Sequence, residues 1–271
     1  MNAERLACAL AIGGLDPGGG AGVIADLRAF EAAGAFGCAV IALVTVQSTS
    51  GMKSARAVAA REVVAQAREV TVHQRVRAFK IGALGNSANI LAVANLLAAH
   101  PRVPAIVDTP MLPTRGRSRL LAERAIATMR KSLLPRATLV TANTSEVEAL
   151  TGMRVTTVSG AYDAATALRG LGARAALVKG GHLDGPSAVD VLAIGGEVTE
   201  LRARRLAIGP THGTGCTFAS LVAGRLAVAG RADDATIVDA VRWAKRLHHA
   251  AIARARDVGG TQRVLVFRGR S

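Results

Sequence analysis

The strongest constraint on the fold is the alternation along the chain of short apolar runs with longer amphipathic stretches. Most of the short runs are apolar throughout, as strands buried on both faces are. The longer stretches place apolar residues at i, i+3 and i+4, the spacing of a helix that covers a core. This pattern predicts an α/β fold of three layers, with helices on both faces of a central, mostly parallel sheet. No change of composition marks a linker, so residues 1–271 are expected to form a single domain.

Candidate elements can be read from these runs. The expected strands are at residues 6–13, 38–46, 78–82, 105–108, 138–141, 175–179 and 188–194. The expected helices are at residues 22–33, 60–72, 88–99, 119–133, 146–151, 161–171, 217–229 and 235–256. Gly195 and Gly196 separate the strand-like runs 190–194 and 198–201, which predicts a hairpin at one edge of the sheet. Because ligands of such sheets bind outside the carboxyl ends of the strands, the residues just after each strand are the candidate site.

The charge of the chain restricts its partners. It has 34 Lys and Arg against 19 Asp and Glu, a formal charge of +15, which favours an anionic partner. The basic residues are scattered and aromatic residues make up 3%, whereas single-stranded nucleic acid usually stacks on aromatic rings. We therefore expect an acidic or phosphorylated small molecule and no nucleic acid. No apolar stretch approaches the ~18 residues of a membrane span, so no membrane contact is expected. Three dispersed cysteines give no disulfide framework, which favours a cytoplasmic location.

Two glycine-rich turns, at residues 13–22 and 209–217, each lead into an expected helix. Such turns leave backbone N–H groups free to face an anion, and the helix dipole adds positive potential. The first turn fits neither the dinucleotide fingerprint nor the P-loop, and a flexible turn is the alternative. In the second, Gly213, Thr214 and Gly215 can donate to an oxyanion. Cys216 follows them, where a helix N-terminus lowers a thiol pKa, so it is either reactive or a small buried hydrophobe.

Four polar residues lie at or after the ends of other expected strands. Asp108, Asn143 and Glu146 offer the oxygen ligands that suit Mg²⁺, and Lys179 is a point charge for phosphate. Each has a simpler interpretation: Asp108 as a helix cap, Asn143 with Glu146 as a capping box, and Lys179 as a solvated surface lysine. Taken together, these clusters and the glycine-rich turns indicate phosphoryl transfer.

A set of motifs adds a resemblance to a known family. The motifs are residues 14–22 with Ala25 and Asp26, then 44–49, 80–82, 143–146, 178–182 and 211–217. From about residue 6 to residue 245 the chain resembles the hydroxymethylpyrimidine/phosphomethylpyrimidine kinases of thiamine biosynthesis, in the ribokinase-like superfamily. The resemblance implies a ribokinase-like fold, a homodimer, and an enzyme that uses ATP and Mg²⁺. That enzyme phosphorylates 4-amino-5-hydroxymethyl-2-methylpyrimidine and then phosphorylates the monophosphate again.

The resemblance also implies residue roles. The substrate-binding residues would be Gln47, which hydrogen-bonds the aminopyrimidine, and Asp26, Gly14 and Gly20. The catalytic anion hole would be Gly213, Thr214, Gly215 and Cys216, with Cys216 either a base or a group that shapes the site. Asp108 and Glu146 would organise Mg²⁺, and Lys179, Asn143 and Thr211 would bind the nucleotide.

The chain departs from the family pattern at a few places, which leaves alternatives. These places are Leu15, where the family usually has Ser, residues 109–110, the basic stretch 112–117, and residues 257–261. A pyridoxal kinase of the same fold is the nearest alternative, and Gln47 with Cys216 favours the pyrimidine. A non-catalytic pyrimidine or nucleotide sensor and a nucleic-acid binder are the other classes. The set of Mg²⁺ and phosphate ligands argues against the sensor, which has no need to organise Mg²⁺.

Overall fold

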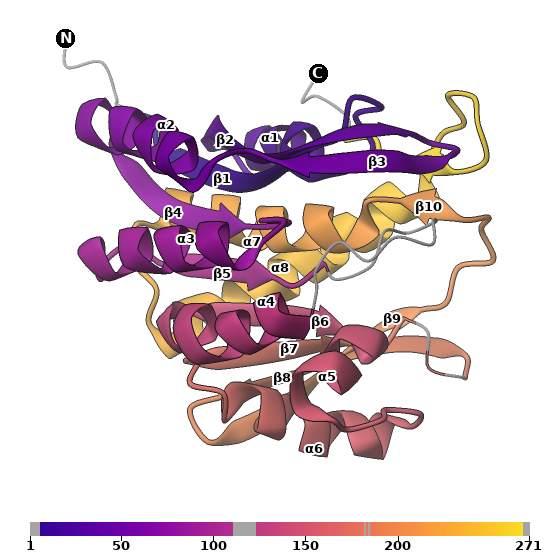
Figure 1. Cartoon of the computed structure of the whole chain (residues 1–271). Helices are drawn as coiled ribbons and strands as arrows, with labels where there is room; N and C mark the ends of the chain where they lie inside the picture. The colour runs from indigo at the N-terminus through magenta and orange to yellow at the C-terminus, as the bar shows by residue number, and fades with distance from the viewer. Residues whose placement is uncertain (1–5, 111–122, 182, 184, 268–271) are drawn as a thin grey trace, which may run out of the picture.

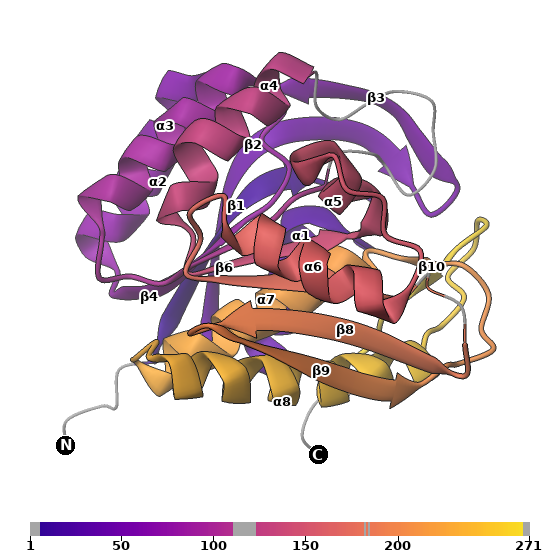
Figure 2. The same cartoon turned by 90° about the horizontal axis from the view of Figure 1, so that it is seen from below.

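The chain forms an α/β fold in which one large sheet is covered by helices on both faces (Figures 1 and 2). The structure, a computed structural model, describes residues 6–110, 123–181, 183 and 185–267. The strands of the sheet are β1 (Cys8–Leu15), β2 (Phe36–Ser48), β3 (Gly51–Ala57), β4 (Val76–Ile81), β5 (Ala105–Asp108), β6 (Leu139–Asn143), β7 (Ala175–Lys179), β8 (Ser187–Ile194) and β9 (Glu197–Arg204).

The order of these nine strands is β3-β2-β1-β4-β5-β6-β7-β8-β9. The six central strands, β2, β1, β4, β5, β6 and β7 in this order, pair in parallel. The outer strands β3, β8 and β9 pair antiparallel with their neighbours. The predicted fold class, a mostly parallel sheet between helices, is therefore confirmed. The predicted hairpin is β8–β9, and its turn residues Gly195 and Gly196 have φ of +60° and +91°. Both values lie in the left-handed region that glycine tolerates best, which is why this sequence turns here.

The helices form two layers. They are α1 (Gly22–Ala32), α2 (Ala60–His73), α3 (Ser87–Ala99), α4 (Glu123–Thr128), α5 (Thr144–Thr151), α6 (Val158–Arg169), α7 (Thr214–Ala229) and α8 (Asp234–Ala253). One hydrophobic core joins α2 to α6 to one face of the sheet, and a second joins α1, α7 and α8 to the other. Figure 2 shows the two layers on opposite sides of the strands.

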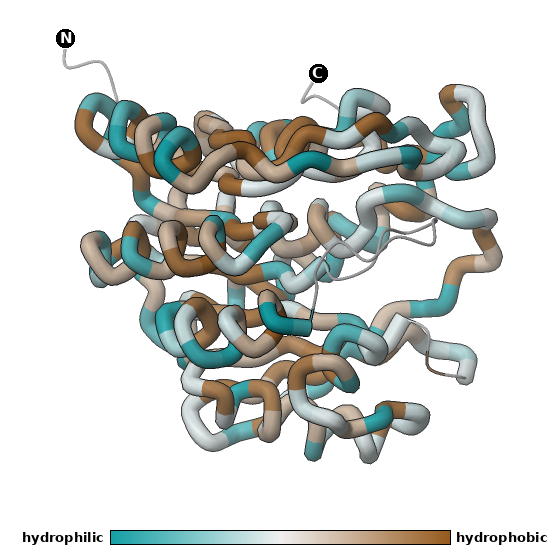
Figure 3. The backbone as a smooth tube through the Cα atoms, in the orientation of Figure 1, coloured by the Kyte–Doolittle hydropathy of each residue, from teal (hydrophilic) through white to brown (hydrophobic). Residues whose placement is uncertain are grey.

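The sequence pattern explains this layering. The strands β1, β4 and β5 are apolar along most of their length, and Leu10, Ile12, Phe79 and Ile106 are fully buried. The outer helices α2 and α3 show both hydrophobic and hydrophilic turns along the tube (Figure 3), as helices with one solvent face do. Consecutive parallel strands joined by helices place their carboxyl ends at one edge of the sheet.

The structure differs from the sequence-based elements at three places. Strand β3 was not predicted, because residues 51–57 are largely exposed and carry no alternation of large apolar residues. The short parallel strands β10 (Thr211–His212) and β11 (Arg263–Val264) were also not predicted. Strands of two residues are too short to show a hydrophobic alternation in the sequence. The predicted helix 119–133 is α4 followed by a π-helical turn (Met129–Leu133), and residues 119–122 lie outside the described residues. Among the residues described, no helix is long and apolar enough to span a membrane.

Candidate active site

A cavity of about 870 Å³ opens at the carboxyl ends of the parallel strands, where the sequence predicted a site. The residues predicted for substrate, phosphate and metal meet there although they are far apart in the sequence. Those that line it are Gly14, Asp26, Gln47, Asp108, Asn143, Glu146, Lys179, Gly213, Thr214, Gly215 and Cys216. Gly20 and Thr211 lie beside the lining instead: a Cβ on Gly20 would be 2.5 Å from the His212 ring, and Thr211 pairs with Arg263 of β11.

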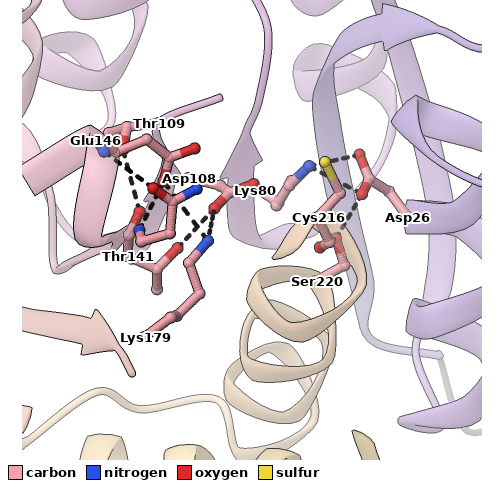
Figure 4. Close-up of polar contacts among 10 residues, drawn as sticks. Asp26, Lys80, Asp108, Thr109, Thr141, Glu146, Lys179, Cys216 and Ser220 are labelled. Carbon is pink, nitrogen blue, oxygen red and sulfur yellow. Dashed lines mark hydrogen bonds and ion pairs between the residues drawn. The ribbon is translucent and has the colours of Figure 1, made fainter. Parts of the chain in front are cut away.

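Asp108 and Lys179 form the centre of one end of the cavity (Figure 4). Lys179 Nζ donates to Asp108 Oδ1 at 2.9 Å, and Thr141 Oγ1 donates to the same oxygen at 2.9 Å. Burial alone would raise the pKa of Asp108, but the charges of Lys179 and Lys80 and the hydrogen bonds from Lys179 and Thr141 together lower it. Lys179 has 16% of its side chain exposed, so the interpretation as a solvated surface lysine is wrong. This end of the cavity therefore holds an ionised carboxylate and a fixed ammonium.

Glu146 stands beside this pair as part of a capping box at the start of α5. Asn143 Oδ1 accepts from Glu146 N at 2.9 Å, and Glu146 Oε2 accepts from Asn143 N at 2.7 Å. The capping interpretation is thus confirmed. Glu146 Oε2 also lies 3.8 Å from Lys179 Nζ. Burial raises the pKa of Glu146 to about 7, with Lys179 opposing the shift and Asp108 adding to it.

The donor set at this end fits a magnesium ion that keeps waters and phosphate oxygens. Asp108 and Glu146 are two hard oxygen ligands that line the same cavity. In the part of the chain that the structure describes, no three His, Cys, Asp or Glu side chains could hold a metal by themselves. Mg²⁺ is usually bound by one or two carboxylates together with substrate phosphates, so two carboxylates are enough.

The N-terminus of α7 forms the wall next to this end. Its N-cap residue Gly213 has φ of +71°, and a Cβ there would lie 1.9 Å from Gly20 O. A Cβ on Gly215 would lie 3.0 Å from Lys179 Nζ. Glycine at both positions therefore lets the backbone approach its neighbours closely. The first N–H groups of a helix have no acceptor within the helix, so this turn offers donors to an anion in the cavity.

Cys216 lies on the first turn of α7 and lines the cavity. Burial raises the pKa of its thiol to about 12, with Asp108 and Asp26 adding to the shift and Lys80 and Lys179 opposing it. Of the two interpretations that the sequence left open, the neutral thiol fits this surrounding better than a standing thiolate. The helix N-terminus favours the thiolate of Cys216, but burial and the carboxylates of Asp108 and Asp26 disfavour it more strongly.

Lys80, which the sequence indicated only as part of a motif, pairs with Asp26 (Figure 4), and both residues line the cavity. Its Nζ lies 2.9 Å from both oxygens of Asp26, and Ser220 Oγ donates to Asp26 Oδ1 at 2.6 Å. Burial would lower the pKa of Lys80, but the charge and hydrogen bonds of Asp26, together with nearby Cys216 and Asp108, raise it. Asp26 therefore lines the cavity with its carboxylate already committed to two partners. The only sequence signal for Lys80 was a lysine inside an otherwise buried strand.

The glycine-rich loop before α1 is organised by Asp16, which the sequence analysis did not single out. Asp16 Oδ1 accepts from Gly18 N and its Oδ2 from Ala21 N, both at 2.9 Å, and its carbonyl accepts from Gly19 N at 3.0 Å. The expectation that the glycine N–H groups of this turn are free to face an anion is therefore wrong for Gly18 and Gly19. The N–H groups of Gly18 and Ala21 bind a carboxylate of the protein itself, that of Asp16.

The other end of the cavity holds the predicted Gln47 beside His212. Gln47 Nε2 lies 3.0 Å from His212 Nε2, and the same imidazole nitrogen lies 2.9 Å from Asp16 Oδ2. Leu43 and Met52 also line the cavity, and Met52 is the partner of Gln47 in the β2–β3 pairing. His212 was missed because a histidine before a glycine-rich turn has no spacing signature of its own.

The segment 257–261, one of the departures from the family pattern, lies against the β2–β3 turn. Thr49 Oγ1 donates to Gly259 O at 2.6 Å, and Thr261 Oγ1 donates to Thr49 O at 3.2 Å. It thus supports the hairpin that carries Gln47. The basic stretch 112–117 and the last residue of the motif 178–182 lie outside the described residues.

Comparisons with known proteins agree with this geometry. The model of the phosphomethylpyrimidine kinase family matches residues 16–265. A hydroxymethylpyrimidine/phosphomethylpyrimidine kinase of Streptomyces coelicolor is 42% identical over 251 residues, which cover 93% of this chain and 90% of that protein.

Solved structures show the same fold. A phosphomethylpyrimidine kinase of Clostridium difficile is 30% identical with a TM-score of 0.76, over 90% of this chain and 99% of that one. A pyridoxal kinase of Bacillus subtilis, in an ADP complex, is 27% identical with a TM-score of 0.87, over 96% of this chain and 97% of that one. These likenesses confirm the predicted ribokinase-like fold.

Proposed function

The chain belongs to the phosphomethylpyrimidine kinase family, and from this premise we propose that it is an ATP-dependent kinase of thiamine biosynthesis. Its substrates are 4-amino-5-hydroxymethyl-2-methylpyrimidine and the monophosphate of that alcohol, which it converts to the diphosphate. The γ-phosphoryl group of ATP is transferred to the hydroxymethyl oxygen in the first step and to the phosphate in the second.

One observation carries this proposal: a single short segment, residues 212–216, touches both ends of the cavity. His212 meets Gln47 at 3.0 Å, and a Cβ on Gly215 would lie 3.0 Å from Lys179 Nζ. A ring bound beside Gln47 thus has its substituent directed along the N-terminus of α7 toward the phosphate end. Phosphoryl transfer needs this positioning together with stabilisation of charge more than it needs covalent help.

The roles of the residues follow from their places in the cavity. The N–H groups of Gly213, Thr214 and Gly215 stabilise the oxygens of the transferring phosphoryl group, and Lys179 binds the nucleotide phosphates. Asp108 and Glu146 would hold Mg²⁺, which would neutralise phosphate charge when bound. Cys216 remains a thiol and shapes the wall beside the reacting alcohol.

The remaining substrate-binding and nucleotide-binding residues act at the edges of the cavity. Gln47 hydrogen-bonds the aminopyrimidine, and Gly14 lets the ring approach the backbone. Asn143 supports the phosphates through its amide. Gly20 and Thr211 act indirectly, by supporting His212 and the turn that follows it.

The test is steady-state ADP release with Mg·ATP on hydroxymethylpyrimidine, on its monophosphate and on pyridoxal, each with the wild-type protein and Gln47→Ala. Turnover of both pyrimidines that collapses in Gln47→Ala supports the proposal. Turnover of the monophosphate alone limits the enzyme to the second step. Silence on all three substrates would contradict kinase activity on vitamin precursors.

Pyridoxal phosphorylation is the second candidate, and the structural likeness to the pyridoxal kinase, with a TM-score of 0.87, is what favours it. The family match and the 42% identity to a pyrimidine kinase favour the first candidate more strongly. A preference for pyridoxal in the same assay would reverse this order.

We further propose that the protein acts as a single-domain, cytoplasmic homodimer. The continuous nine-stranded sheet supports one domain, and three unpaired cysteines fit a reducing compartment. The dimer rests on the family resemblance, and analytical ultracentrifugation would test it directly.

A further inference from the structure

The imidazole of His212 has two polar neighbours on one nitrogen. Its Nε2 lies 2.9 Å from Asp16 Oδ2 and 3.0 Å from the carboxamide of Gln47. The side chains of His212 and Asp16 are each only 3% exposed, so water does not compete for these contacts. One nitrogen cannot donate to Asp16 and accept from Gln47 at the same time. The orientation of the Gln47 amide therefore depends on where the His212 proton resides.

Asp16 fixes that proton. Burial would raise the pKa of Asp16, but the hydrogen bonds from His212 and from the backbone of Ala21 and Gly18 lower it. An ionised carboxylate only accepts hydrogen bonds, so His212 Nε2 must carry the hydrogen and donate it. This holds whether the imidazole is neutral or charged. Carboxamide oxygen and nitrogen are distinguished by their partners, so the Gln47 atom 3.0 Å from this N–H is assigned as Oε1.

The ring cannot easily turn to offer a different atom. His212 lies in β10, whose backbone pairs with Val264 of β11, and a Cβ on Gly20 would already lie 2.5 Å from its Cδ2. Within the described residues, His212 Nδ1 is buried and has no hydrogen-bond partner. Among the residues that the structure describes, the polar partners of the ring are thus Asp16 and Gln47, both on the Nε2 side.

We propose that Asp16 and His212 lock the Gln47 carboxamide, with Oε1 on His212 and NH₂ toward the substrate, so that Gln47 reads the order of donor and acceptor on the pyrimidine edge. This inference rests on the proposed function, because it takes the substrate to be a pyrimidine beside Gln47. The second lone pair of Oε1 accepts from an amino group, and the NH₂ group donates to the adjacent ring nitrogen. A 4-aminopyrimidine presents this order of donor and acceptor.

A 4-oxopyrimidine presents the reverse order, a carbonyl acceptor beside a ring N–H. A glutamine free to rotate its amide would pair with either edge equally well. With the oxo compound, Oε1 of the locked Gln47 faces the carbonyl oxygen of the ring, and its NH₂ group faces the ring N–H. Neither contact can form a hydrogen bond, so buried polar groups are left unpaired. His212 is therefore a positioning residue for specificity, and it acts through Gln47.

The test compares kcat/KM for the 4-amino alcohol and its 4-oxo analogue, 5-hydroxymethyl-2-methylpyrimidin-4-one, in the wild type and in variants. The wild type is expected to prefer the amino compound by at least about 100-fold. His212→Leu removes the lock and is expected to reduce that ratio by about tenfold or more. His212→Gln keeps an N–H for both neighbours and is expected to restore most of the preference. His100→Leu, at a histidine that packs on Phe79 outside the cavity, is the matched control and should leave the ratio unchanged.

The outcomes separate this inference from the proposed function. No turnover of the amino alcohol by the wild type contradicts the function itself. Turnover with an unchanged ratio in His212→Leu overturns the lock alone. If His212→Leu does not fold, ¹⁵N NMR of the wild-type imidazole decides: a hydrogen-bearing Nε2 supports the lock, and a bare, pyridine-type Nε2 overturns it.

Discussion

Lys80 Nζ lies 2.9 Å from both carboxylate oxygens of Asp26, and these two side chains are 1% and 0% exposed. The pair joins β4 to α1, and Ser220 extends it to α7. Three elements that contribute residues to the cavity lining are thereby tied at one point. A buried ion pair of this kind is costly to break, because the remaining charge has no solvent.

Removing one partner should therefore destabilise the fold. Lys80→Met is expected to lower the free energy of unfolding by about 3–5 kcal/mol, measured by urea titration with circular dichroism. The double variant Lys80→Met with Asp26→Asn should regain part of this loss, since no buried charge is then left alone. Arg174→Met is the control, because it breaks a half-exposed pair with Asp234 that is worth about 0–1 kcal/mol. Equal effects of the two single variants would contradict the prediction.

Glu146 should make stability depend on pH near neutrality. Burial raises its pKa in the folded state from 4.5 to about 7, so between these values the folded chain holds a proton that the unfolded chain has lost. The contribution of protonated Glu146 to the free energy of unfolding is therefore fully present below pH 4.5 and is lost as the pH rises through 7. At about 1.4 kcal/mol for each unit, the loss amounts to about 3 kcal/mol.

The measurement is urea unfolding at pH 4.5 and pH 7.5 without ATP or Mg²⁺, on the wild type and on Glu146→Gln. Between pH 4.5 and pH 7.5, the free energy of unfolding of the wild type should fall by about 3 kcal/mol more than that of the variant. Burial lowers the pKa of His248 to about 3, and its opposite slope is common to both proteins and cancels. Identical pH slopes in the two proteins would show that Glu146 is ionised throughout.

Cys216 should react slowly with alkylating reagents although it lines the cavity. Burial raises its pKa to about 12, so the thiolate that attacks iodoacetamide is scarce at pH 7.5. We expect labelling on the order of 10³-fold slower than that of a free cysteine thiol, followed by mass spectrometry of the peptide that contains Cys216. Labelling at the rate of a free thiol would instead point to a thiolate, and a role as a base would then regain support.

The sequence predicted the layers and the gathering of the site well, for a physical reason. Parallel strands end at one edge of the sheet, so residues at their carboxyl ends, such as Asp108 and Lys179, are expected on the same side of the molecule. The pairing of Asp16 with His212 could not be predicted, because it joins residues 196 positions apart through a contact that no period encodes. Strand β3 was missed for a related reason: backbone pairing with β2 stabilises it although most of its residues are exposed and show no apolar alternation.

The glycine at position 213 should be irreplaceable, and this can be separated from general damage to the turn. In Gly213→Ala the new Cβ would lie 1.9 Å from Gly20 O at a φ of +71°, so the backbone must move. Because the N–H groups that follow are the proposed anion hole, we expect kcat to fall by about 10²–10³-fold. Gly209→Ala is the matched control in the same turn, since nothing lies within 4 Å of its Cβ position, and it should retain near wild-type kcat. Both variants are assayed below their melting temperatures. If Gly213→Ala is as active as Gly209→Ala, the proposal that this segment forms the anion hole is contradicted.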